Sequence, residues 1–300
     1  MNSSPTRRRF IQGALAATLA APLLAAETET KQPKLKKAVK FDMIQTKGSI
    51  KEKFELIKSI GFLGCEFNSP GDFDRDEAVK AQAETGIIIH GVIDSVHWKD
   101  RLSDPDPAVR ARGVEALKTA IADAKKFGST SILLVPGRVN AKSGESYEEC
   151  WARSHEEIKK VLPLVADSGA RLAIEVVWND FITKPSQFVE YIDSFNDPHV
   201  GGYFDVSNMV KYGVPPADWI RALGPRMVKF DFKGFSLEKF KTDPKKAWVP
   251  IGEGDENWPE VLKALDEINY HGWATAEVAG GGEKELRDVN ERMNRILGLA

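Results

Sequence analysis

Short apolar runs alternate with longer amphipathic stretches along most of the chain. From residue 38 onward, eight runs of five to nine residues are rich in β-branched and aromatic side chains, which predicts buried strands. Each run precedes a stretch with apolar residues at helical spacing, which predicts an amphipathic helix. The predicted strands are AVKFDMI, GCEFNS, GIIIHGVID, SILLVPG, LAIEVVW, GGYFDVS, MVKFDFKG and ATAEV. The predicted helices cover residues 50–60, 75–85, 107–127, 147–167, 184–195, 215–223, 258–268 and 283–297.

Eight strand and helix units in about 260 residues have the size and order of a (β/α)8 TIM barrel. The competing fold is a doubly wound open sheet, which normally carries a glycine-rich phosphate loop after an early strand. Neither G-x-G-x-x-G nor G-x-x-x-x-G-K-[ST] occurs in the chain. The glycine run 280–282 opens the last predicted helix, and we interpret it as a flexible turn rather than an anion site. We therefore expect one α/β barrel domain over residues 38–300.

The first 26 residues differ in character from the rest. Three consecutive arginines, Arg7 to Arg9, precede an alanine-rich, weakly apolar stretch that ends near Ala26. This order resembles a twin-arginine export signal, and the apolar stretch is too short to span a bilayer. Residues 27–37 are polar and lysine-rich, and we interpret them as a linker. We expect export to the periplasm, cleavage near Ala26 and no stable membrane insertion afterwards.

The charge of the chain bears on its class of partner, and its cysteines bear on whether it contains a disulfide. Cleavage near Ala26 would remove three arginines and no acidic residue, leaving 39 basic and 44 acidic residues and a formal charge of about −5. An acidic chain argues against nucleic acid as the partner. The two cysteines, Cys65 and Cys150, fall on a predicted strand and inside a predicted helix, so we interpret both as packing residues rather than a disulfide.

Four acidic residues stand at or near the ends of four consecutive predicted strands. They are Glu175, Asp205, Asp231 and Glu277, on strands five to eight. Catalytic groups of a barrel project from the carboxyl ends of its strands, so we expect these carboxylates on one side of the barrel mouth. A divalent metal would compensate their mutual repulsion.

The seventh strand places charged residues on its inward face. Strand parity puts Lys229, Asp231 and Lys233 on one side, with Val228, Phe230 and Phe232 on the other side facing the helices. Buried charges are costly unless they pair. We expect Lys229, the deepest, to form a structural ion pair and Lys233, nearer the mouth, to contact a substrate oxygen.

Several stretches resemble the xylose isomerase-like barrels of sugar isomerases and epimerases, including hydroxypyruvate isomerase and the ketose 3-epimerases. They are LAIEVVWN, GGYFDVSNM, WATAEV, SVHWKDRLSDPDPAVR, AKKFGSTSILLVPG and PIGEGDENWPEVLKAL, and the resemblance covers almost the whole chain after the leader. It implies that Glu175, Asp205 and Glu277 bind a divalent metal, and that Glu175 and Glu277 also act as acid and base. The family's strand-seven histidine is Asp231 here, and a histidine that often follows the strand-six aspartate is Asn208.

An all-carboxylate site favours a hard cation, Mn²⁺ or Mg²⁺, over Zn²⁺. A metal at this place would polarise a carbonyl and stabilise an enediolate while carboxylates move the proton. The loss of the histidine also leaves open a barrel that binds no metal.

Further residues are candidates for substrate contacts. His97 and Trp98 follow strand three in a rim loop, Glu66 and Asn68 end strand two, and Asn179 and Trp178 follow Glu175. With Lys233 and Asn208 they complete the predicted substrate site. The other histidines are expected elsewhere: His90 in the core, His155 on a solvated helix surface, and His199 and His271 at the bottom of the barrel.

The sequence thus predicts a divalent-metal-dependent sugar isomerase or epimerase that acts on an unphosphorylated ketose or keto-sugar. Two alternatives remain open: a keto-glycoside lyase, hydratase or hydrolase that uses the same metal site, and a non-catalytic sugar-binding barrel. The sequence also leaves a homo-oligomer open.

Overall fold

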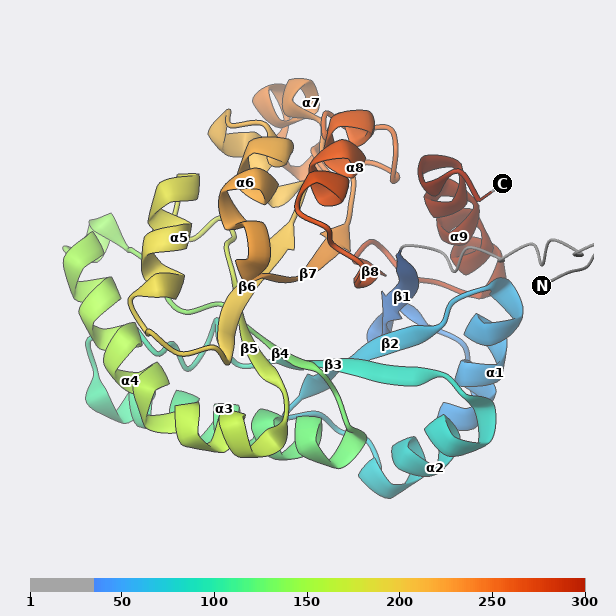
Figure 1. Ribbon diagram of the computed structural model, residues 1–300, viewed down its shortest axis with the longest axis horizontal. Coiled ribbons are helices and arrows are strands. Elements are labelled where there is room, and N and C mark those ends of the chain that lie inside the picture. The colour runs from blue at the N-terminus through green and yellow to red at the C-terminus, as the bar shows by residue number, and fades with distance from the viewer. Residues whose placement is uncertain (1–34, 300) are drawn as a thin grey trace, which may run out of the picture. The chain divides into compact units, whose positions relative to one another are not determined.

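The computed structural model describes residues 35–299, and in this range eight parallel strands close into a barrel in sequence order. Each strand pairs with the next, and β1 pairs with β8 to complete the ring. The predicted TIM barrel is therefore confirmed (Figure 1). The strands are β1 (Lys36–Lys40), β2 (Gly64–Ser69), β3 (Ile88–Asp94), β4 (Ser131–Leu134), β5 (Arg171–Glu175), β6 (Val200–Asp205), β7 (Met227–Phe232) and β8 (Trp273–Ala276).

Helices follow the strands and cover the outside of the barrel (Figure 1). Eight of them match the predicted helices within two residues, and α7 lies in the long segment between β7 and α8. The helices are α1 (Ile50–Ile60), α2 (Arg75–Thr85), α3 (Pro107–Phe127), α4 (Tyr147–Ser168), α5 (Pro185–Asp193), α6 (Pro216–Leu223), α7 (Leu237–Thr242), α8 (Trp258–Glu267) and α9 (Glu283–Leu297).

Local sequence signals set the helix ends. Ser49 starts α1 by accepting a hydrogen bond from the Glu52 amide, while the Glu52 side chain accepts one from the Ser49 amide. This reciprocal capping satisfies two amides that the first turn leaves free. Gly61 ends the helix with φ of 111°, a conformation that glycine adopts without steric cost.

Two features of the N-terminal part differ from the sequence prediction. β1 begins at Lys36, inside the predicted linker, because Lys36 and Lys37 pair with β8. The strand also ends at Lys40, and Phe41–Met43 form a short 3-10 helix instead of continuing the apolar run. The predicted export signal, its cleavage site and residues 27–34 lie outside the described residues.

Aromatic side chains fill the layer between strands and helices. Phe232 of β7 stacks on Trp258 of α8 with ring centroids 4.2 Å apart, and Phe204 of β6 lies against Trp219 of α6 at 6.1 Å. Burying each such side chain stabilises the fold by roughly 1.5–3 kcal/mol. Cys65 and Cys150 are buried and unpaired, as predicted. No helix within residues 35–299 is both long enough and apolar enough to span a bilayer.

The interior of the barrel is polar as well as apolar. Inward-facing residues include Lys40, Glu66, Tyr203, Lys229 and Asp231, all of which are almost inaccessible to solvent. Gly91 of β3 makes room for this layer, because a Cβ atom there would lie 2.6 Å from Oε1 of Glu66. The barrel thus places a charged layer directly below its carboxyl-terminal mouth.

Candidate metal centre

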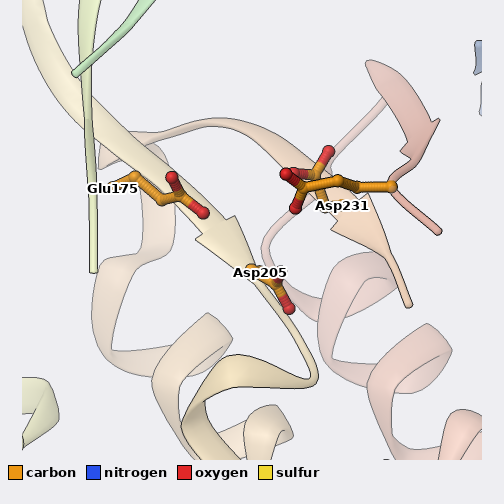
Figure 2. Close-up of side chains that lie close together, drawn as sticks. Glu175, Asp205 and Asp231 are labelled. Atoms are coloured by element: carbon orange, nitrogen blue, oxygen red, sulfur yellow. The ribbon is translucent and has the colours of Figure 1, made fainter. Parts of the chain in front are cut away.

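Four carboxylates meet at the carboxyl-terminal mouth of the barrel. We name Glu175, Asp205, Asp231 and Glu277 the carboxylate cluster. Glu175 ends β5, Asp205 ends β6, Asp231 lies on β7, and Glu277 directly follows β8. Each contributes one carboxylate oxygen to a group in which all four atoms lie within 4.8 Å of one another. Three of these side chains are seen close together in Figure 2. The sequence-predicted set therefore lies together in space.

The members of the cluster differ in their access to the mouth. Asp205 and Asp231 are fully buried. Glu175 and Glu277 line a cavity of about 490 Å³, which we name the first cavity. The two glutamates can therefore reach a bound small molecule, whereas the two aspartates lie below them.

Lys233 spans the upper part of the cluster. Its Nζ atom donates to Oδ2 of Asp205 at 2.9 Å and to Oε2 of Glu277 at 2.7 Å. Burial raises the pKa of Glu277, but Lys233 and Lys40 outweigh burial and hold that pKa at about 2. Glu277 is therefore ionised at neutral pH.

Asp231 is held from two sides by groups on other strands. Its Oδ1 atom accepts a hydrogen bond from the Tyr203 hydroxyl at 2.7 Å, and its Oδ2 atom lies 3.1 Å from Nζ of Lys40. Lys40 also donates to Glu66 at 2.7 Å and to the Tyr203 hydroxyl at 3.0 Å. Burial raises the pKa of Asp231 well above its usual range, although Lys40 opposes the shift.

Burial also raises the pKa of Glu175 well above its usual range, and repulsion from the three neighbouring carboxylates adds to the shift. Around the mouth lie five carboxylates, the four of the cluster and Glu66, and three lysines, Lys40, Lys229 and Lys233, which pair with all of these carboxylates except Glu175. Formally, two negative charges remain, the charge that a divalent cation balances. Oδ2 of Asp231 is buried and accepts no hydrogen bond. The donors are all carboxylate oxygens, so the site fits a hard divalent cation.

Most of the predicted substrate contacts surround the first cavity. Asn68, His97, Trp98, Trp178, Asn208 and Lys233 all line it. His97 is nearly buried with an unpartnered Nδ1 atom, and burial lowers its pKa to about 4. It is thus a neutral imidazole at pH 7. Asn208 donates from Nδ2 to Oε1 of Glu175 at 3.5 Å, which places its amide beside a cluster member.

Two residues of the predicted substrate site, Asn179 and Glu66, do not line the first cavity. Asn179 uses its side chain within the protein, because Nδ2 donates to the Gly137 carbonyl at 2.7 Å and Oδ1 accepts from the Phe181 amide at 3.3 Å. Glu66 points into the charged layer below the mouth, where it pairs with Lys40. Neither residue lines the first cavity.

Replacement of Asn179 by alanine is expected to lower the free energy of unfolding by about 1–2 kcal/mol, because it leaves the buried Gly137 carbonyl unpaired. Urea unfolding followed by tryptophan fluorescence measures this change. An unchanged unfolding midpoint would contradict the structural role of Asn179.

Lys229 and His90 lie where the sequence analysis predicts them, whereas two further residues near the mouth were not predicted. Lys229 points inward and contacts His90 and Glu66, which confirms its expected structural pairing. His90 is buried and stacks on Trp273, as expected of a core histidine. Lys40 and Trp248 were not predicted, although Lys40 is a charged residue within an apolar run.

The remaining histidines lie away from the mouth. His155 on α4 is half-buried and stacks on Phe195, so it is less solvated than predicted. His199 and His271 precede β6 and β8, at the opposite end of the barrel from the cluster.

Comparisons with known proteins agree with this architecture. A family profile described as xylose isomerase-like TIM barrel matches residues 54–296. An L-ribulose-5-phosphate 3-epimerase of Escherichia coli O1:K1 is 26% identical over 261 residues, which cover 81% of this chain and 89% of that protein. The solved structure of a D-tagatose 3-epimerase-like protein covers 88% of this chain and 98% of its own, with a TM-score of 0.74 and 18% identity. The structure of the IOLI protein with a bound zinc atom has the same coverage, a TM-score of 0.75 and 14% identity.

Proposed function

The chain belongs to the xylose isomerase-like TIM barrel family, and from this premise we propose that it is a divalent-metal-dependent sugar epimerase or isomerase acting on a ketose or keto-sugar. The enzyme class, sugar isomerase or epimerase, is that of the related L-ribulose-5-phosphate 3-epimerase, which matches most of both chains. The metal, the mechanism and the substrate are our proposals.

One observation carries the proposal: the cluster is divided between cavity and core. Glu175 and Glu277 line the first cavity, while Asp205 and Asp231 are fully buried below it. This division lets two glutamates contact substrate carbon atoms while the aspartates help to hold a cation. A purely structural charge network would not require two of its carboxylates to face a cavity.

The proposed chemistry is the transfer of one proton at the carbon next to a carbonyl. The carboxylate cluster would hold a divalent cation, which would supply positive charge to polarise this carbonyl and to offset the negative charge that forms when the proton leaves. One of the two glutamates removes the proton and the other returns it, which inverts the carbon when they face opposite sides of the substrate. His97 and Asn208 are positioned to contact substrate hydroxyls, and Trp98 and Trp178 offer aromatic faces to the sugar ring.

We propose Mn²⁺ or Mg²⁺ as the cation, because no imidazole or thiolate belongs to the cluster. We also propose that the protein is exported to the periplasm by the twin-arginine route, on the basis of Arg7 to Arg9 and the alanine-rich stretch after them.

Metal binding predicts a measurable gain in stability. After treatment with a chelator, Mn²⁺ at about one hundred times its dissociation constant is expected to stabilise the protein by roughly 2.7 kcal/mol, seen as a higher thermal midpoint. The variant Asp205→Asn should lose most of this gain, whereas the matched control Asp167→Asn, on the exposed surface of α4, should keep it. No shift with Mn²⁺, Mg²⁺, Co²⁺ or Zn²⁺ would instead favour a non-catalytic sugar-binding barrel.

The reaction type is tested by product analysis. Incubation of the Mn²⁺-loaded protein with a panel of free ketoses and keto-sugars in D₂O should give isomers of unchanged carbon skeleton with deuterium beside the carbonyl, measured by NMR and mass spectrometry. Release of water or of a fragment would assign the site to a lyase, hydratase or hydrolase.

A further inference from the structure

A second cavity of about 930 Å³ adjoins the first cavity on the β7 and β8 side of the barrel mouth. The two cavities share four lining residues, which are Lys233, Trp248, Glu277 and Val278. Because Glu277 borders both, the second cavity begins at the carboxylate cluster itself. The first cavity is already within the usual range of small-ligand sites, roughly 300–1,000 Å³, so one monosaccharide does not require the second.

The boundary between the cavities is aromatic. Trp248 stacks on Trp178 with ring centroids 5.1 Å apart and planes 18° apart, and its side chain remains 42% exposed. Trp178 lines only the first cavity and Trp248 lines both. Nζ of Lys233 lies over the Trp248 ring, 4.8 Å from its centroid, so the exposed part of this ring is the apolar surface that the boundary offers to a ligand ring. Beyond Trp248, the wall continues through Val249, Pro250 and Ile251.

The second cavity is poorly suited to a phosphate group, although barrels often bind phosphate after strands seven and eight. The start of α9 is already occupied, because the Glu285 carboxylate accepts a hydrogen bond from the Gly282 amide at 2.9 Å. Arg292 is paired with Asp288 and Glu253, each at 2.7 Å. Apart from Arg292 and the residues shared with the first cavity, Lys284 is the one basic residue among the described residues that lines the second cavity. The acidic residues Glu285 and Asp288 line it as well. These charges balance and favour a neutral ligand.

We propose that the second cavity is a subsite for the second ring of a neutral keto-glycoside, whose keto-sugar ring lies at the carboxylate cluster. This inference rests on the proposed function and narrows its substrate class from keto-sugars in general to unphosphorylated glycosides. The related 3-epimerase acts on a 5-phosphate, so the two proteins would differ in how they hold the part of the substrate that does not react.

The experiment compares substrates that differ only in the second ring. Solvent deuterium uptake gives kcat/KM for 3-keto-D-glucose and for phenyl 3-keto-β-D-glucopyranoside, with L-ribulose and L-ribulose 5-phosphate as the phosphate pair. The phenyl glycoside should exceed the free keto-sugar by about tenfold or more, which corresponds to roughly 1.4 kcal/mol, and the 5-phosphate should bring no advantage.

A variant that fills the second cavity separates the subsite from the reaction centre. Ala279 is exposed and lines only the second cavity, so Ala279→Trp should remove the advantage of the phenyl glycoside and keep kcat/KM for 3-keto-D-glucose within about twofold, well under 1 kcal/mol. That retained activity also shows that the variant is folded. The matched control, Ala83→Trp on the exposed surface of α2, should change neither value. Equal losses on both substrates in Ala279→Trp, or a preference for the 5-phosphate, would overturn the subsite.

Failure of the proposed function gives a different result. If deuterium enters none of the four compounds, the epimerase proposal fails, and the subsite is judged by calorimetric binding of phenyl β-D-glucopyranoside. Binding that Ala279→Trp abolishes and Ala83→Trp preserves would support the subsite, and absence of binding would reject it.

Discussion

Replacing Glu277 by glutamine is expected to lower kcat for the sugar substrate by about a thousandfold or more, because proton transfer by a positioned carboxylate contributes roughly 10²–10⁴ in rate. Glu277 reaches the first cavity, and Lys233 helps to hold it ionised. Glutamine keeps the size of the side chain and cannot take up the proton. The matched control is Glu238→Gln on α7, which lies outside both cavities.

The variant Glu175→Gln should be measured beside Glu277→Gln, because an epimerase with two bases can still exchange the proton of one epimer when one base is lost. Each single variant should fail to interconvert the two epimers but still exchange solvent deuterium into one of them, and the two variants should exchange opposite epimers. NMR detection of deuterium in each epimer measures this. Calorimetric titration with Mn²⁺ separates lost chemistry from weakened metal binding. Turnover within about tenfold of the parent in both variants, roughly 1.4 kcal/mol of barrier, would contradict the assignment.

The sequence predicted the fold and the cluster because both depend on local patterns. Alternating apolar runs and amphipathic helices predicted the barrel, and strand parity correctly placed Lys229, Asp231 and Lys233 inward. Once consecutive strands are neighbours, carboxylates at four successive strand ends must share one side of the mouth.

The sequence pattern gives no side-chain direction beyond the end of a strand, and Asn179 is an example. The sequence placed it at the mouth because it lies four residues after Glu175. β5 ends at Glu175, and the chain then turns, with the Asn179 amide donating to the Val177 carbonyl at 2.9 Å. The side chain of Asn179 therefore bonds to the β4 loop at Gly137 instead of facing the cavity.

Long-range contacts explain what the sequence missed. Lys40 lies on the first strand, and its partners Glu66 and Asp231 lie 26 and 191 positions further along, so only the closed barrel brings them together. Trp248 lies in the long segment between β7 and α8, which has no strand period from which its direction could be deduced. The structure also shows how a buried carboxylate is tolerated at this place on β7: Tyr203 contacts Oδ1 of Asp231 and Lys40 contacts Oδ2.

This arrangement predicts that Lys40→Met destabilises the metal-free protein by about 3–5 kcal/mol, the usual cost of leaving a buried charge without its partner. Glu66 and Asp231 are almost inaccessible to solvent, and Lys40 lies 2.7 Å and 3.1 Å from their carboxylate oxygens. At roughly 2–4 °C per kcal/mol for a domain of this size, the thermal midpoint should fall by about 10 °C. Urea unfolding of the chelator-treated protein measures the change, and Lys47→Met, at an exposed position, is the matched control.

A double-mutant cycle shows whether the loss comes from Asp231. Asp231→Asn removes the charge that Lys40 neutralises, so adding it to Lys40→Met should recover more than about 1 kcal/mol of the lost stability, a coupling typical of residues in contact. Mn²⁺ should raise the thermal midpoint of Lys40→Met more than that of the parent, because a cation takes over the charge compensation that the lysine provided. If Lys40→Met unfolds within about 1 kcal/mol of the parent, or if Asp231→Asn adds its full cost in the Lys40→Met background, Lys40 is not the counter-ion of Asp231.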